Sequence, residues 1–267
     1  MSILAHIVAA ALAGGVISTL VAAFTLTLGP AWISRLVSFA VGALLGAVFL
    51  EMLPHALEDG DAEHVMLVML AGLLAFFLLE KLVLWRHSHG HEEHDDAADE
   101  SEHEHAMHAH GHDHGHDQGR SGLMILIGNS VHNFCDGIVI AASFLADPAL
   151  GLAATLAIVA HAVPQQVGDF AVLVHSGYTR RRAFTLNVAT GCATLAGALG
   201  AYFALSDMQQ ALPTVLAIAA ASLLYVAVAD LIPSLHRRPE PLETAKQSLL
   251  IAAGIGVIVA VHALLRH

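Results

Sequence analysis

The sequence predicts an all-α integral membrane protein that crosses the bilayer eight times. Of its 267 residues, 56% are hydrophobic and 13% are charged, which is about half the usual charged share, and the mean hydropathy is +0.67. A soluble domain of this size needs more charge to cover its surface, and the hydrophobic content excludes disorder for most of the chain. A membrane protein is the class that remains.

Eight apolar runs, divided by Gly, Pro and charge clusters, are each long enough for one bilayer crossing. The expected spans are 4–28, 33–56, 64–86, 121–145, 149–175, 182–205, 212–235 and 246–265. The first run lacks a basic segment before it and a convincing cleavage site. We therefore interpret it as a retained helix and not as a signal peptide.

The basic residues indicate the orientation. With eight spans, ten of the eleven Lys and Arg residues fall on one side of the membrane, and only Arg266 falls on the other. This bias places the basic side in the cytoplasm and both termini outside it, in a membrane that we expect to be a bacterial inner (plasma) membrane. The formal net charge of −12 is concentrated in one loop, and nothing basic enough to bind nucleic acid remains.

That loop divides the chain into three parts, 1–86 with spans one to three, 87–120, and 121–267 with spans four to eight. Residues 87–120 hold ten of the 23 acidic residues and eleven of the 20 histidines. The segment has no apolar face to bury, so we expect a disordered cytoplasmic loop. Its imidazoles and carboxylates favour loose binding of Zn²⁺ or similar ions, and an acidic linker without a metal role is the alternative.

Ionisable residues at membrane depth are costly and are therefore candidates for function. The fourth span carries HNFCDG, in which His132 and Asp136 are one helical turn apart and Asn133 lies beside them. The pair of imidazole and carboxylate suits first-row divalent metals, above all Zn²⁺.

The fifth span carries HAVPQQVGD, in which His161, Gln165 and Asp169 form a stripe at four-residue spacing. Pro164 removes a backbone hydrogen bond there and can kink the helix. A single histidine in a membrane span is more often a hydrogen-bond donor between helices than a metal ligand. Two polar stripes on neighbouring helices favour a metal pathway, because together they need a shared partner to offset desolvation.

Other polar positions give weaker signals. Glu51 and His55 end the second span four residues apart and are candidates to guide ions from the outer mouth, although interfacial solvation explains them as well. Asn187 and Asp230, in the sixth and seventh spans, are candidates to face the helix bundle, with hydrogen bonding between helices as the alternative.

These segments resemble the signatures of the ZIP (Zrt/Irt-like) family of divalent metal transporters, of the prokaryotic type. HNFCDG is similar to the family pattern HNFxDG, and HAVPQQVGDFAVLVHSG is similar to HExPHExGDFAxLxxSG. GALLGAVFLEMLPHAL (42–57) and LLYVAVADLIPSL (223–235) are similar to the family's second-span and seventh-span patterns, and the family also places a His-rich loop between spans three and four.

The resemblance implies a 3+2+3 arrangement, in which spans four and five are enclosed between two inverted three-helix units. It implies the passage of Zn²⁺ or related ions into the cytoplasm. It also implies that His132, Asp136 and His161 are ligands of the primary metal site and that Asn133 is a ligand of an adjacent one.

The chain departs from the family pattern in span five. Ala162 replaces an acidic residue, and Gln165 and Gln166 replace the His and Glu that follow the proline. We therefore expect one bound ion, held less tightly than by carboxylates, with Gln165, Gln166 and Asp169 as further candidate ligands. In the second span, Glu51 stands where the family pattern has His, and His55 stands where it has Glu.

Zn²⁺ is the expected substrate, with Fe²⁺, Mn²⁺ and Cd²⁺ left open, and no organic cofactor is expected. The partners are divalent metal ions and the lipid bilayer, and a homodimer is compatible with the sequence. One alternative is an exporter of the cation-diffusion type, which the eight spans and the PQQVGD segment disfavour. A second is an intramembrane metal-dependent hydrolase, but no span contains HExxH, so we do not expect an enzyme. A third is a membrane metal sensor that transports nothing.

Overall fold

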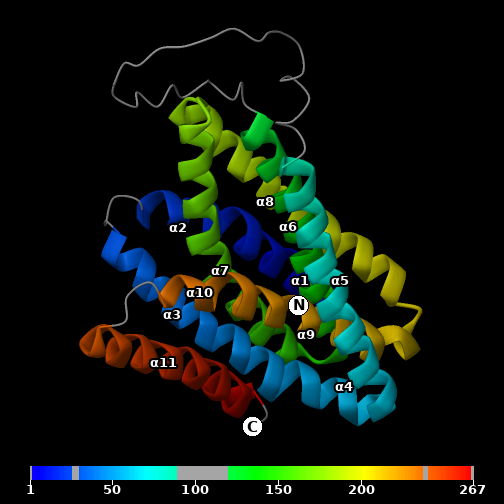
Figure 1. Cartoon of the computed structure of the whole chain (residues 1–267). Helices are drawn as coiled ribbons and strands as arrows, with labels where there is room; N and C mark the ends of the chain where they lie inside the picture. Colours follow the sequence, from blue (N-terminus) through cyan, green and yellow to red (C-terminus); the bar gives the residue numbers. More distant parts are fainter. Residues whose placement is uncertain (1, 26–29, 89–119, 237–239, 266–267) are drawn as a thin grey trace, which may run out of the picture.

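The computed structural model describes residues 2–25, 30–88, 120–236 and 240–265, and within these ranges every regular element is a helix (Figure 1). The eight expected spans correspond to eight helical segments. They comprise α1 (Ile3–Leu12), η1 (Ala13–Ile17) and α2 (Ser18–Thr25); α3 (Pro30–Gly46), η2 (Ala47–Met52) and α4 (Leu53–Asp59); α5 (Ala62–Ser88); α6 (Arg120–Ala146); α7 (Pro148–His175); α8 (Arg180–Leu205); η4 (Gln209–Ala211), α9 (Leu212–Tyr225), η5 (Val226–Leu231) and α10 (Ile232–Leu235); and α11 (Pro241–Leu265).

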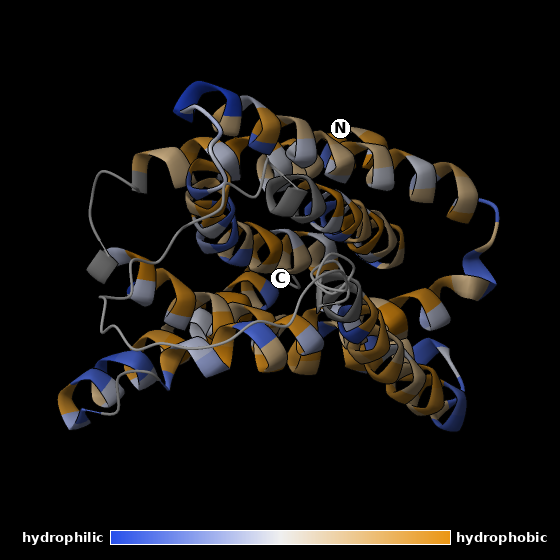
Figure 2. Cartoon of the chain, turned by 45° about the horizontal axis from the view of Figure 1, so that its top comes forward, coloured by the Kyte–Doolittle hydropathy of each residue, from blue (hydrophilic) through white to orange (hydrophobic). Residues whose placement is uncertain are grey.

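Seven of these segments are long and apolar enough to cross a membrane. The remaining one, α6, has 27 residues, or about 40 Å of helix, but its middle carries the HNFCDG segment and other polar side chains. Hydrophobic residues line most helical surfaces, and hydrophilic ones gather at the helix ends (Figure 2). The protein is thus an all-α integral membrane protein. The predicted loop falls, for residues 89–119, outside the described part of the chain.

Polar caps extend several helices beyond the apolar runs. The Asp147 side chain accepts hydrogen bonds from the backbone N–H groups of Ala149 (2.7 Å) and Leu150 (3.2 Å) and starts α7. The last helix begins at Pro241, five residues before the predicted start at 246, because a first-turn proline and the acidic Glu243 favour a helix start. Hydropathy does not register such caps, so the predicted spans were short at these ends.

The helices of the two predicted three-helix units pair with one another. The first span packs against the sixth, the second against the eighth, and the third against the seventh, while α6 and α7 lie side by side (Figure 1). A twofold relation that exchanges spans one, two and three with six, seven and eight maps the first pair onto itself and exchanges the other two pairs with each other. The packing therefore agrees with the inverted repeat.

Successive spans alternate in direction, so the helix ends form two groups. We call one group the basic end, since Arg35, Arg180 and Lys246 belong to it; its helix termini are Thr25, Pro30, Ser88, Arg120, His175, Arg180, Leu235 and Pro241. The opposite group is the terminal end, with Ile3, Asp59, Ala62, Ala146, Pro148, Leu205, Gln209 and Leu265. Contacts agree with this grouping, because the His6 ring stacks on Phe144 at the terminal end.

α7 occupies the centre of the bundle. In the most apolar stretch of 18 residues of α7, 72% of the residues are buried. The corresponding share in α5 and in α11 is only 11%, so these two helices present most of their surface outward. α6 is held tightly against α8, because a Cβ atom on Gly137 would collide with the Thr194 carbonyl and one on Gly197 with the Phe134 carbonyl. This contact fixes the turn of α6 that precedes Gly137, which carries His132 and Asp136.

Two π-helical segments occupy equivalent places in spans two and seven. η2 contains Glu51 and runs into Pro54, and η5 contains Asp230 and runs into Pro233, with each acid three residues before the proline. A proline offers no N–H to the carbonyl four residues earlier, and a π-turn is one way to accommodate that loss. The inverted repeat thus extends to a shared acid–x–x–Pro motif, which sequence periodicity did not reveal.

Candidate metal centre

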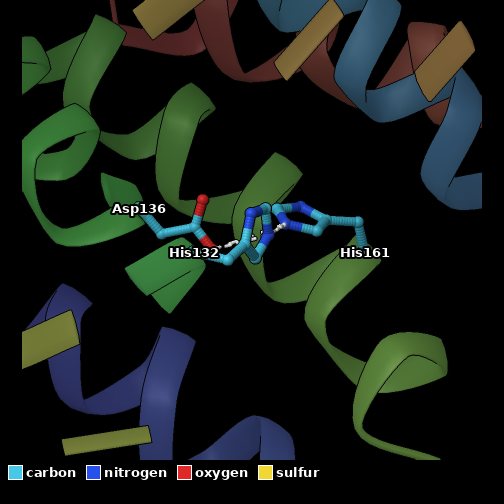
Figure 3. Close-up of side chains that lie close together, drawn as sticks. All are labelled: His132, Asp136 and His161. Atoms are coloured by element: carbon cyan, nitrogen blue, oxygen red, sulfur yellow. Dashed lines mark hydrogen bonds and ion pairs between the residues drawn. The ribbon is translucent and has the colours of Figure 1, made fainter. Parts of the chain in front are cut away.

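α6 and α7 bring His132, Asp136 and His161 together in the middle of the bundle (Figure 3). The Nε2 atoms of the two histidines are 3.3 Å apart, and Asp136 Oδ2 lies 3.5 Å from each of them. Among the described residues, this is the one group of three or more His, Cys, Asp or Glu side chains whose donor atoms all lie within 4.8 Å of one another.

The backbone orients the His161 ring. Its Nδ1 lies 3.0 Å from the carbonyl of Ala157, and because a carbonyl only accepts hydrogen bonds, Nδ1 carries the proton. When the ring is neutral, this leaves the lone pair on Nε2, which faces His132 and Asp136, as in a metal-ligating histidine.

The side chains of the cluster are withdrawn from solvent. Asp136 and His161 are each 1% exposed, and the ion-pair partners of the Asp136 carboxylate are the two Nε2 atoms at 3.5 Å. A buried carboxylate is unfavourable unless a metal ion or a protonated imidazole neutralises it. His132 is less enclosed, with 19% of its side chain accessible.

The distances suit a small tetrahedral ion. Bonds of about 2.0–2.1 Å to imidazole nitrogen and carboxylate oxygen place tetrahedral ligand atoms about 3.3–3.4 Å apart. The observed triangle has edges of 3.3, 3.5 and 3.5 Å. Three protein ligands also leave a fourth position open, as in zinc sites that exchange a water or a substrate.

A polar column continues from this cluster toward the basic end. Gln165, one turn after His161, lies beside the His132 ring, and its Nε2 is 3.5 Å from Asn129 Oδ1 on α6. Asn129 also lies next to the carboxylate of Asp169, one turn further along α7. Gln165 and Asp169 were predicted from the sequence, whereas Asn129 was not, although its spacing of three residues from His132 placed it on the same side of the helix.

Asp230 belongs to the same region. It stands on η5 of the seventh span, and its charge acts on His132, His161 and Asp169. Asn133 is buried on the same turn of α6 as His132, but no hydrogen bond within the described residues joins its side chain to the cluster.

Gln166 faces away from the cluster. Its Nε2 donates to Ser18 Oγ (3.0 Å), and its backbone carbonyl accepts from Asn187 Nδ2 (3.1 Å). Five residues after His161, it points to a different side of the helix. The structure therefore places both Gln166 and Asn187 in the packing between spans one, five and six.

Glu51 and His55 lie near the terminal end, but their side chains do not form a pair. The carboxylate of Glu51, 1% exposed, contacts His262 Nδ1 of α11, whereas His55 Nδ1 lies 2.8 Å from the backbone carbonyl of Glu51. The expected entrance residues thus share one region with a third partner, His262, which the sequence analysis did not name.

An α-helical membrane protein with a group of histidine and aspartate ligands enclosed between two spans has the architecture expected of a metal-ion transporter. The family model for the ZIP zinc transporter matches residues 1–262. The chain belongs to the ZIP family.

Individual relatives agree with this. The chain is 32% identical to human zinc transporter ZIP13 over an alignment of 265 residues. This alignment covers 86% of this chain and 71% of the relative. It is 33% identical over 248 residues to zinc transporter ZIP13 of Pongo abelii, with 86% of this chain and 67% of the relative covered. Human zinc transporter ZIP4 is 31% identical over 253 residues, which cover 76% of this chain and 39% of that protein.

Proposed function

We propose that the protein carries Zn²⁺ into the cytoplasm and that the ion passes between His132, Asp136 and His161. The observation that carries this proposal is the triangle of three donor atoms, two of them on buried residues, with edges of 3.3–3.5 Å, since its dimensions suit a tetrahedral ion. Membership of the ZIP family supports the transport of a divalent metal ion.

The ligand set suits passage better than storage. Asp136 supplies one formal negative charge and the two imidazoles are neutral ligands, so a divalent ion keeps part of its charge uncompensated. Conduction requires a site that is strong enough to receive the ion and weak enough to release it. Gln165 beside the cluster adds an amide and no further charge.

The same chemistry supports a single ion. A second ion bridged to the first would need more carboxylates nearby, and span five offers Ala162 and two glutamines where the family pattern has acidic residues or histidine. Gln166 is also engaged with Ser18. We therefore propose one ion in the central site, with Zn²⁺ favoured and Fe²⁺, Mn²⁺ and Cd²⁺ as further candidates.

The route leads from the terminal end to the basic end. Glu51, with His55 and His262 nearby, supplies the entrance, and the exit continues through Gln165, Asn129 and Asp169. The excess of Lys and Arg at the basic end supports its placement in the cytoplasm. In a plasma membrane, such as a bacterial inner membrane, this direction amounts to uptake.

The test is metal flux in liposomes. The purified full-length protein is reconstituted with a Zn²⁺-sensitive dye inside, and sidedness is established by protease cleavage of the His-rich loop. We expect Zn²⁺ to move from the terminal side to the basic side. Flux only in the opposite direction, or no flux from protein that is folded and inserted, would contradict the proposal.

The variants His161→Ala and His175→Ala are a matched pair. Both histidines are on α7 and both place Nδ1 near a backbone carbonyl four residues earlier, at 3.0 and 3.1 Å, but His175 lies at the basic end outside the cluster. We expect His161→Ala to lower flux roughly tenfold or more, since even indirect ligand partners are worth that much in metal affinity. His175→Ala should retain wild-type flux.

A further inference from the structure

A small cavity lies between α3 and α11 near the basic end, away from the metal centre. Its volume is about 90 Å³, and its lining consists of Ser34, Arg35 and Ser38 of α3 and of Glu243, Lys246, Gln247 and Leu250 of α11. This volume is several times the roughly 10–15 Å³ that a cavity needs to hold one water molecule. The cavity is thus large enough for a group of several heavy atoms.

The charges of the lining favour a singly charged anion. Lys246 Nζ lies 2.7 Å from Glu243 Oε1, so these two charges largely offset each other. The Arg35 guanidinium lies over the Trp32 ring at 5.1 Å, and no carboxylate of the described residues forms an ion pair with it. Two cations and one carboxylate leave a formal charge of +1, which one phosphodiester would neutralise.

The donors of the lining suit phosphate oxygens. A guanidinium donates two parallel hydrogen bonds to a phosphate group. Ser38 is fully buried, and its hydroxyl already donates to the Ser34 carbonyl at 3.0 Å. Ser34 and Lys246 add a hydroxyl and an ammonium to the lining.

The position of the cavity indicates that the phosphate belongs to a lipid. Trp32 is 47% exposed beside Arg35, and exposed Trp rings in membrane proteins lie at the level of the lipid headgroups. On α11, Leu249 follows Lys246 by three residues and is 71% exposed. A headgroup held by Arg35 and Lys246 would therefore have apolar helix surface beneath it for its acyl chains.

We propose that this cavity binds the phosphodiester headgroup of an anionic phospholipid, such as phosphatidylglycerol, in the leaflet at the basic end. Basic pockets between membrane-spanning helices are known sites for such headgroups. The bound lipid would join the ends of α3 and α11. It would therefore stabilise the same helix pair whose opposite end contains the contact between Glu51 and His262.

The test compares the thermal stability of the detergent-solubilised, full-length protein with phosphatidylglycerol, with phosphatidylcholine and with inorganic phosphate. The matched variants are Arg35→Gln and Arg182→Gln, because Arg182 also lies 5.1 Å over an aromatic ring, that of Tyr178, at the basic end but outside the cavity. Native mass spectrometry counts the lipids that each form retains.

We expect phosphatidylglycerol to raise the melting temperature more than phosphatidylcholine does. Arg35→Gln should lose at least half of this difference together with one retained lipid, whereas Arg182→Gln should lose neither. Arg35→Lys keeps the charge without the paired donors and should give an intermediate result, which also covers the case that Arg35→Gln does not fold. Three results would overturn the proposal. The first is an equal loss of the lipid effect in Arg35→Gln and Arg182→Gln, and the second is a wild-type lipid effect in Arg35→Lys. The third is a rise in melting temperature with inorganic phosphate that equals the rise with phosphatidylglycerol.

Discussion

Glu51 on the second span and His262 on the eighth are in direct contact at the terminal end. Nδ1 of His262 lies 2.9 Å from Oε2 and 2.7 Å from Oε1 of the carboxylate, which is 1% exposed, while the histidine is 30% exposed. The buried carboxylate of Glu51 thus contacts a partly exposed imidazole on α11, a helix that begins 190 residues after Glu51 in the chain. The pair stabilises the contact between η2 and α11 near the mouth of the proposed route.

We expect His262→Ala to destabilise the protein, because it leaves the Glu51 carboxylate buried without its partner. The expected loss is about 1–3 kcal/mol, observed as a lower melting temperature in detergent. The double variant Glu51→Gln with His262→Ala should recover part of this loss, since it removes the buried charge. Additive effects of the two substitutions would show that the residues do not act as a pair.

Gln165→Glu should make the centre bind its ion more tightly. Gln165 lies beside His132, and a glutamate there has the same length and adds a second negative charge near the ion. Tighter binding slows release. In the liposome assay we expect a lower apparent KM for Zn²⁺ with an unchanged or lower maximal rate; no change in either would mean that Gln165 does not face the ion.

Adding Ala162→Glu to this variant should partly restore a second metal position, because it returns the acidic residue of the family pattern. The number of metal ions bound per protein, measured after removal of the His-rich loop, should then exceed that of Gln165→Glu alone. An unchanged stoichiometry would contradict our reason for expecting a single ion.

Asn129→Ala should slow the exit of the ion. Asn129 stands between Gln165 and Asp169 on the basic side of the cluster, so its loss interrupts the polar column but leaves all three central ligands in place. We expect a several-fold lower maximal rate with little change in KM. The neighbouring variant Ser130→Ala is the control, because its hydroxyl donates to the Leu126 carbonyl within the same helix; equal effects of the two would remove Asn129 from the route.

The deletion of residues 90–117 should leave transport intact and change only its response to cytoplasmic metal. The segment is hydrophilic, carries many imidazoles and needs no fold to bind ions weakly. Flux as a function of Zn²⁺ on the basic side, with and without the deletion, checks this. Complete loss of flux from inserted protein would place the loop within the pathway.

The sequence was a good guide to the fold and to the residues within one helix. The apolar runs located eight helical segments, seven of them apolar enough to cross a membrane, and the helical period placed His132 and Asp136 on one face of α6. The periodicity of one helix does not predict how two helices are placed against each other, and the structure shows this. The register between α6 and α7, fixed by packing, determines that His161 meets this pair.

Where the sequence analysis fell short, the cause was long-range packing or a local break in the helical period. Glu51 and His55 were predicted to lie together near the outer mouth, but no sequence pattern indicated the contact of the Glu51 carboxylate, in the π-helical segment η2, with His262 from a distant span. Gln166 was grouped with Gln165 by the family pattern, although neighbouring residues on a helix face different directions.

The central claim is that a single Zn²⁺ ion is bound by His132, Asp136 and His161, and X-ray absorption at the zinc edge tests it most directly. The protein lacking residues 90–117, which removes nine of the loop histidines, is loaded with one equivalent of Zn²⁺. We predict a four-coordinate ion with two imidazole ligands at about 2.0–2.1 Å. This signal should fall to one imidazole in His161→Ala and stay unchanged in His175→Ala. An imidazole count that is the same in His161→Ala as in the parent protein would contradict the account.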